Sequence, residues 1–65
     1  MWLIINGQKE ETQTTTLDAL LAERKLNSAA IVTELNGIII QKEHYASTSL
    51  QENDRLELVQ FVGGG

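Results

Sequence analysis

The sequence contains no cysteine and no proline, and it has one histidine, one tryptophan, one tyrosine and one phenylalanine among 65 residues. Without cysteine there is no disulfide and no thiolate metal ligand, and a lone histidine does not make a usual metal site. Chains of this size often depend on such cross-links, so the apolar core must stabilise the fold alone. The length allows one domain with a thin core, which argues against an enzyme with a deep pocket.

Positive charge and long apolar runs are also scarce. Nine acidic residues oppose five basic ones, and the formal net charge is −4. This balance argues against binding to nucleic acid or to anionic lipid and favours a basic partner surface. No apolar run approaches the ~20 residues of a membrane span, and the N-terminus has no signal-peptide pattern. We therefore expect a cytoplasmic protein that contacts neither nucleic acid nor membrane.

Two Asn-Gly pairs predict tight hairpins. Asn6-Gly7 and Asn36-Gly37 each follow a segment rich in β-branched residues, and a two-residue hairpin turn requires the positive φ angles that Asn and Gly tolerate. The segment after the first turn is polar and rich in threonine, which suits an exposed strand. The predicted strands of the two hairpins are residues 1–5, 8–14, 31–35 and 38–40.

A helix is predicted between the hairpins, from Thr16 to Lys25, because its leucines share one helical face. Thr15 and Asp18 have the spacing of a capping box with a shorter acid, and Asn27 is expected to stop the helix. The leucines of the apolar face are Leu17, Leu20 and Leu21.

After the second hairpin the sequence predicts an irregular crossing and one last strand. Residues 42–49 sustain no period, Tyr45 and Leu50 are expected to face inward, and residues 51–54 form a turn. Arg-Leu-Glu-Leu at 55–58 alternates as a half-buried strand does. The order of elements predicts an α+β fold in which one helix packs across a mixed four- to five-stranded sheet. This is the β-grasp, or ubiquitin-like, arrangement.

The alternation fails after Leu58, because Val59 and Phe61 occupy the solvent side of the predicted strand. Together with Val62 they predict a partner-binding surface at the end of the sequence. The alternative interpretation is a frayed extension of the core.

The second candidate feature is the run Gly63, Gly64 and Gly65, which contains three of the five glycines of the sequence. A glycine tail can be a frayed end or an expression scar. It can also carry a reacting terminal carboxylate into the narrow cleft of another enzyme, since no Cβ obstructs a nucleotide phosphate or a sulfur nucleophile. We expect a folded domain at 1–62 and a flexible tail at 63–65 that threads such a site.

The remaining polar residues are predicted to have structural roles. His44 is expected to lie in a surface loop, because it has no second histidine or cysteine to share a metal site. Glu52, Asp54 and Glu57 are expected to be solvated, with Asp54 shaping a turn. No internal catalytic residue and no metal site are predicted.

The whole sequence resembles the ThiS family, the sulfur carriers of thiamine biosynthesis. The resemblance covers essentially all 65 residues and rests on the order and spacing of several short motifs. It departs from the usual family pattern at Gln41 and Lys42, where members often have Pro and Arg. The motifs are Asn6-Gly7, the leucines between Leu17 and Leu21, Glu34-Leu35-Asn36-Gly37, Lys42-Glu43-His44-Tyr45, Asn53-Asp54 and Phe61-Val62-Gly63-Gly64-Gly65.

The resemblance implies that the chain is a protein co-substrate and not an enzyme. An E1-like adenylyltransferase of the ThiF type would use ATP and magnesium to adenylate Gly65, and a persulfide protein would supply sulfur for a thiocarboxylate. A thiazole synthase of the ThiG type would then receive that sulfur, and the carrier itself would bind no cofactor. Three alternatives stay open: the small sulfur-carrying subunit of molybdopterin synthase, a ubiquitin-like protein modifier, and an interaction module with an inert tail.

Overall fold

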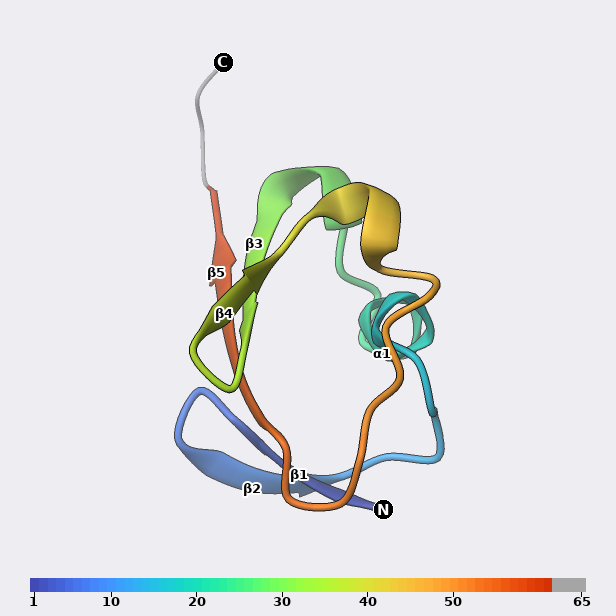
Figure 1. The fold of residues 1–65 in the computed structure, drawn as a ribbon, viewed down its shortest axis with the longest axis vertical. Coiled ribbons are helices and arrows are strands. Elements are labelled where there is room, and N and C mark those ends of the chain that lie inside the picture. The colour runs from blue at the N-terminus through green and yellow to red at the C-terminus, as the bar shows by residue number, and fades with distance from the viewer. Residues whose placement is uncertain (62–65) are drawn as a thin grey trace.

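The computed structural model describes residues 1–61, and its elements follow the predicted order (Figure 1). One α-helix, α1 (Leu17–Glu23), and two short 3₁₀ helices, η1 (Ser28–Ala30) and η2 (Lys42–His44), accompany the sheet. The strands are β1 (Trp2–Ile5), β2 (Gln8–Glu11), β3 (Ile31–Leu35), β4 (Ile38–Ile40) and β5 (Arg55–Gln60).

The strands form one mixed sheet in the order β2-β1-β5-β3-β4. The last strand, β5, is central: it runs parallel to β1 and antiparallel to β3, and Leu56 is paired with Ile5 on one side and Leu35 on the other. The two hairpins supply the outer strands β2 and β4. The predicted α+β fold, one helix across a mixed sheet, is therefore confirmed, with five strands.

The core lies between one face of this sheet and α1, which Figure 1 shows nearly end-on beside the sheet. The three leucines of α1 are fully buried, as the helical periodicity predicts. Tyr45 and Leu50 face inward from the crossing segment, also as predicted, and the Tyr45 hydroxyl donates a hydrogen bond to the Ile31 carbonyl at 3.3 Å. The buried apolar residues are Leu3, Ile5, Leu17, Leu20, Leu21, Ile31, Tyr45, Leu50 and Leu56.

Both hairpin turns have the predicted geometry. Asn6 and Gly7 have φ angles of 50° and 82°, and Asn36 and Gly37 have 52° and 87°. Positive φ at both positions identifies the turn whose twist matches that of the flanking strands. The strand after the first turn is shorter than predicted and ends at Glu11. Thr12, which follows it, is buried, and its hydroxyl bonds to Thr14 and Glu23.

The capping box predicted at the start of the helix does not form. The helix begins after Thr16, whose hydroxyl donates to the Asp18 carboxylate at 2.7 Å and caps no backbone N–H. The first amides of the helix instead donate to carbonyls of the crossing segment: Leu17 to Thr48 at 3.0 Å and Asp18 to Tyr45 at 3.1 Å. A capping box was predicted from local spacing, whereas a segment about thirty residues later satisfies these donors.

The helix also ends earlier than predicted, at Glu23 instead of Lys25, and Asn27 does not stop it. Lys25 adopts φ of 58°, and the Lys25 and Leu26 amides donate to the carbonyls of Ala22 and Leu21 at 3.0 and 2.9 Å. This pair of bonds is a Schellman motif, which here closes the helix without the usual glycine. Asn27 instead begins η1, where its side chain accepts a hydrogen bond from the Ala29 amide.

Candidate functional site

The site predicted from the sequence lies at the end of β5, and Leu56 anchors that strand. Leu56 is fully buried between the two hairpins, and its neighbours Arg55 and Glu57 are exposed on the other face. Pairing with β3 continues along the whole strand to Gln60. The Phe61 amide adds one more bond, to the Ala30 carbonyl at 2.8 Å. The strand is therefore held by its backbone up to the last described residue.

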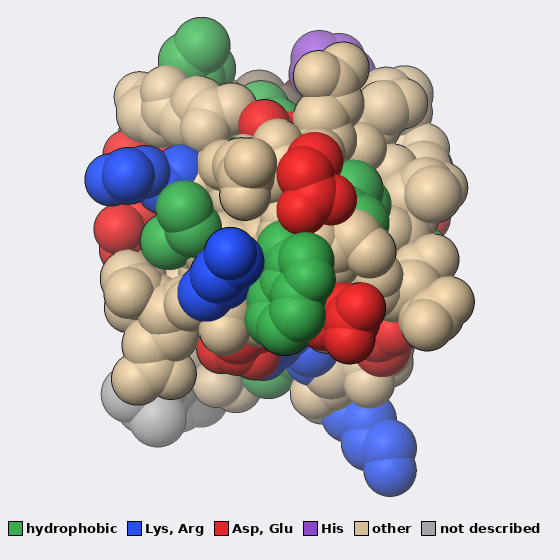
Figure 2. Space-filling model, turned by 90° about the horizontal axis from the view of Figure 1, so that it is seen from below, with side chains coloured by type: hydrophobic (Ala, Val, Ile, Leu, Met, Phe, Trp, Pro, Cys, Tyr) green, Lys and Arg blue, Asp and Glu red, His purple; other side chains and the backbone are tan. Residues whose placement is uncertain are grey.

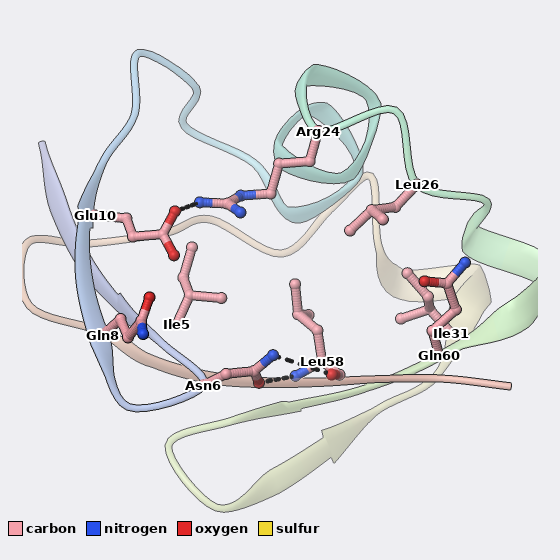
Figure 3. Close-up of a pocket in the computed structure, with 9 residues that line it drawn as sticks. All are labelled: Ile5, Asn6, Gln8, Glu10, Arg24, Leu26, Ile31, Leu58 and Gln60. Atoms are coloured by element: carbon pink, nitrogen blue, oxygen red, sulfur yellow. Dashed lines mark hydrogen bonds and ion pairs between the residues drawn. The ribbon is translucent and has the colours of Figure 1, made fainter.

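Among the strands of residues 1–61, none lies beside the other edge of β5 after Leu56, because the β1 pairing ends there. The side chain of Asn6 satisfies the backbone at this edge (Figure 3). Its Nδ2 donates to the Leu58 carbonyl at 3.3 Å, and the Leu58 amide donates to its Oδ1 at 2.8 Å. The Asn-Gly pattern predicts only a turn for Asn6, and the sequence contains no local signal for this second role.

An asparagine of the second hairpin bonds in a similar way to the backbone at the start of β5. The Arg55 amide donates to Asn36 Oδ1 at 2.9 Å, and Asn36 Nδ2 donates to the Asp54 carboxylate at 3.0 Å. Asp54 also accepts a bond from the Gln51 amide at 2.8 Å, so its predicted role in shaping the turn is confirmed. Each hairpin turn therefore contributes an asparagine that bonds to the backbone of β5, Asn36 at its first residue and Asn6 at Leu58 in its second half.

Val59 and Phe61 are exposed, by 55% and 61%, on the face of the sheet opposite α1. The alternative interpretation, a core extension, is wrong for these two residues. Val59 is directly opposite Val32 of β3, and Ile39 of the neighbouring strand β4 is 57% exposed. Val32 and Ile39 are not among the residues predicted for this surface, although the alternation within 31–35 is a signal that places Val32 on this face. Val62 and the tail residues Gly63, Gly64 and Gly65 lie outside the described residues.

The opposite end of the same face carries Trp2, which is 41% exposed. The Lys9 ammonium lies 5.4 Å from the centre of the Trp2 ring, and the Trp2 amide donates to both oxygens of Glu52 at 3.2 Å. Figure 2 shows the molecule from the end where β1 and β2 lie, with apolar side chains bordered by basic and acidic ones. The Trp2 ring therefore has a cationic neighbour on its own sheet face.

A hollow of about 340 Å³ lies on the inner face beside the end of α1 (Figure 3). Its floor includes Ile5 and Leu58, and its rim carries an ion pair between Arg24 and Glu10. The other rim groups are amides, so the hollow contains neither a nucleophile nor a histidine to act as a base. Its composition does not support catalysis at this position.

The single histidine and the carboxylates form no metal-binding group within residues 1–61. His44 is exposed in η2, and its carbonyl accepts bonds from Ser47 and Thr48. Within the described part of the chain, no group of three His, Asp or Glu side chains could hold a metal ion. The helices described there are too short to cross a bilayer.

Comparison with known proteins indicates the same family as the sequence motifs. The ThiS family model matches residues 3–65. The sulfur carrier protein ThiS of Bacillus subtilis is 40% identical over 65 residues, covering 97% of this chain and 98% of that protein. The crystal structure of a thiamine biosynthesis protein (ThiS) from Geobacter metallireducens superposes with a TM-score of 0.84, at 28% identity and full coverage of both chains.

A longer protein also contains a similar segment. The thiazole synthase of Paramagnetospirillum magneticum is 38% identical over 66 residues, which cover all of this chain but only 20% of that protein. This chain thus spans about a fifth of the length of that relative. The family match over nearly the whole chain, the full-length Bacillus relative and the shared fold agree, and the chain belongs to the ThiS family.

Proposed function

We propose that this chain is a sulfur carrier protein of thiamine biosynthesis. Its reacting group is the carboxyl of Gly65, which becomes a thiocarboxylate and donates sulfur for thiazole formation. The chain is a co-substrate and supplies no catalytic side chain. The observation that carries the proposal is membership of the ThiS family together with a strand whose backbone is held up to Phe61, two residues before the first glycine of the segment at 63–65.

Activation of the tail needs a carboxylate and a partner that binds ATP and magnesium. The Gly65 carboxylate attacks the α-phosphorus of ATP, pyrophosphate leaves, and an acyl adenylate forms. The outer sulfur of a persulfide protein then attacks the carbonyl carbon and displaces AMP, which leaves an acyl disulfide between the carrier and the donor. A thiol of the donor or of the activating enzyme attacks the donor sulfur of that bond, so a new disulfide forms and the thiocarboxylate leaves. An E1-like adenylyltransferase supplies the nucleotide site, so the carrier needs no cofactor of its own.

The domain and the tail have separate tasks in this proposal. The folded domain presents the tail, and residues 63–65 pass through the narrow part of a partner's active site without side chains. Four residues beyond Phe61 can span at most about 14 Å when extended. The partner's active site must therefore lie close to the end of β5, and the partner must contact the surface around Val59, Phe61 and Val62.

Thiazole synthase is the expected receiver of the sulfur. A relative with that name contains a segment similar to this entire chain, which supports a link between the carrier and the synthase. The activating enzyme and the persulfide donor follow from the proposed chemistry. We expect these reactions in the cytoplasm because the first of them consumes ATP.

The experiment is an intact-mass measurement after incubation with ATP, magnesium, an E1-like adenylyltransferase of the ThiF type and a persulfide donor. The proposal predicts that one oxygen is replaced by one sulfur and that fragmentation locates the change at Gly65. A variant lacking Gly65 should keep its circular dichroism spectrum and should not gain sulfur. An unchanged mass, with an enzyme that activates the Bacillus carrier in parallel, contradicts the proposal.

The same samples show which enzyme receives the sulfur. Consumption of the thiocarboxylate by thiazole synthase supports the thiamine role, whereas consumption by molybdopterin synthase redirects the proposal. Covalent conjugates of the chain with other proteins would instead indicate a protein modifier.

A further inference from the structure

The short helix η1 holds the end of β5 on one side. The Phe61 amide, one residue after β5 ends, donates to the Ala30 carbonyl of η1 at 2.8 Å. On the opposite edge, the described strands pair with β5 only as far as Leu56, and Asn6 reaches only to Leu58. Within residues 1–61, the last backbone contact before the tail is therefore the one that η1 makes.

One side chain from a distant segment ties η1 to the rest of the fold. The Lys42 ammonium, at the start of η2, donates to the Ala29 carbonyl at 2.7 Å. The bonds that η1 makes to its own neighbours are local, such as those from the Ala29 and Ala30 amides to Asn27. None of the three residues of η1 is buried, and a 3₁₀ helix this short has few internal bonds. Among the described side chains, only that of Lys42 reaches η1 from a distant part of the sequence with a hydrogen bond.

The Lys42 side chain bridges a space that packing does not fill. A hollow of about 310 Å³ lies between η2 and the strands β3 and β4, and its lining includes Lys42 and Ile31. Figure 1 shows both 3₁₀ helices at the end of the molecule where β5 finishes. The bond from an ammonium group to a carbonyl is charge-assisted and therefore stronger than a neutral one. The position of η1 relative to η2 thus depends on this lysine.

We propose that Lys42 is a positioning residue for adenylation of the tail. It holds η1, η1 holds the Phe61 amide, and the Phe61 backbone sets the point from which the tail starts. This inference rests on the proposed function and adds a residue outside β5 to those that direct the tail. Lys42 acts through these two hydrogen bonds and touches neither ATP nor the reacting carboxyl.

The orientation of the reacting carboxyl depends on where the strand ends. Gly65 lies four residues beyond Phe61, and the last three residues of the sequence are glycines without side chains. When the end of β5 moves, the carboxyl approaches from more directions, and fewer of them lead to the α-phosphorus of bound ATP. Such a loss of orientation lowers the rate of the chemical step rather than the affinity for the enzyme. A loosened η1 should therefore lower kcat.

Lys42→Met tests this role because it removes the donor and keeps a long side chain across the hollow. The kcat for adenylation should fall by roughly two- to fivefold, with the KM for the carrier unchanged. Lys42→Arg keeps a donor with a similar reach and should restore most of the wild-type kcat. Because Lys42 and Ala29 are both exposed, the melting temperature should change by less than about 4 °C in either variant.

The structural part of the proposal has a readout that needs no enzyme. In Lys42→Met the Phe61 amide should exchange its hydrogen with solvent roughly two- to tenfold faster than in the wild type, because its acceptor on η1 is less firmly held. The Leu58 amide donates to Asn6 on the other edge of β5 and should keep its wild-type rate. It is therefore the internal reference.

Two control variants separate positioning from charge and from stability. Lys9→Met makes the same charge change beside Trp2, on the strands at the opposite end of the molecule (Figure 1), and should alter neither kcat nor exchange at Phe61. Tyr45→Phe removes the buried hydroxyl that donates to the Ile31 carbonyl and should lower the melting temperature by roughly 4–8 °C. It should leave kcat within about twofold of the wild type, because the pairing of β3 with β5 holds Ile31 without that bond.

The experiment follows pyrophosphate release by an adenylyltransferase of the ThiF type at several concentrations of each full-length variant, with amide exchange measured by NMR. A lower kcat and faster exchange at Phe61 in Lys42→Met, both reversed in Lys42→Arg, support the proposal. Unchanged exchange at Phe61 overturns it, and so does a raised KM with unchanged kcat, which would show that Lys42 contacts the enzyme directly. Failure of the proposed function is distinct, because the wild-type chain would then not be adenylated, whereas exchange at Phe61 still decides whether Lys42 holds the strand end.

Discussion

The asparagine of the first hairpin allows a test of how the end of β5 is positioned. We consider Asn6→Gly, because glycine adopts the φ of 50° that this turn position requires and removes only the side chain. The turn should therefore survive. The two hydrogen bonds to Leu58 are lost, and the edge of β5 beyond Leu56 has no other partner among the described strands.

The size of the effect follows from those two bonds. Each contributes roughly 0.5–1.5 kcal/mol, and we take the lower part of that range because the contact is exposed to solvent. The greater backbone freedom of glycine in the unfolded chain adds roughly 0.5 kcal/mol. The expected loss in the free energy of unfolding is about 1.5–2 kcal/mol. This corresponds to a fall in melting temperature of roughly 6–15 °C.

The matched control is Asn36→Gly at the other hairpin. This residue has a φ of 52° and contacts the start of β5, through Arg55 and Asp54. Both variants should lose similar stability in urea titrations. At a temperature where both remain folded, Asn6→Gly should lower kcat/KM for ATP-dependent adenylation by roughly three- to tenfold, since the strand end that presents the tail is less well oriented. Asn36→Gly should keep the wild-type rate.

Two results would refute this reasoning. If Asn6→Gly unfolds at the wild-type urea concentration, the side-chain bonds to Leu58 do not hold the strand in solution. If both variants lose adenylation equally, the activating enzyme responds to general destabilisation rather than to the position of the end of β5. The assay is pyrophosphate release, followed at several carrier concentrations so that kcat and KM are separated.

Three further predictions concern other parts of the chain. Phe61→Ala should change the free energy of unfolding by less than about 0.5 kcal/mol, because the ring is 61% exposed, yet it should slow adenylation; an equal rate would return Phe61 to a purely structural role. Lys25→Gly should stabilise the protein by roughly 0.5–1 kcal/mol in urea, because Lys25 holds a left-handed conformation at the end of α1, whereas Lys25→Ala should bring no gain. Leu56→Ala should destabilise it by roughly 2–5 kcal/mol, because this fully buried side chain lies at the centre of the sheet; a loss below 1 kcal/mol in thermal unfolding would show that the site collapses around the cavity.

The fold and the family were predicted from the sequence because their signals are local. Each Asn-Gly pair forms a turn through its own backbone preferences, the leucines of α1 face inward because of the helical period, and Leu56 is buried because β5 alternates. The ends of α1 were not predicted, since Thr48 and Tyr45 supply the partners of its first amides from a distant segment. Local spacing at Thr15 and Asp18 contains no information about that segment.

The sequence by itself thus determined the order of elements, the turns, the buried faces and the glycine segment at 63–65. Only the tertiary structure decided which residues stand side by side at the end of β5. The pairing of β3 with β5 sets Val32 against Val59 and Glu34 against Glu57, and the reach of Asn6 across to Leu58 depends on the parallel pairing of β1 and β5. These contacts join residues more than twenty positions apart, and strand register, which the whole core selects, determines them.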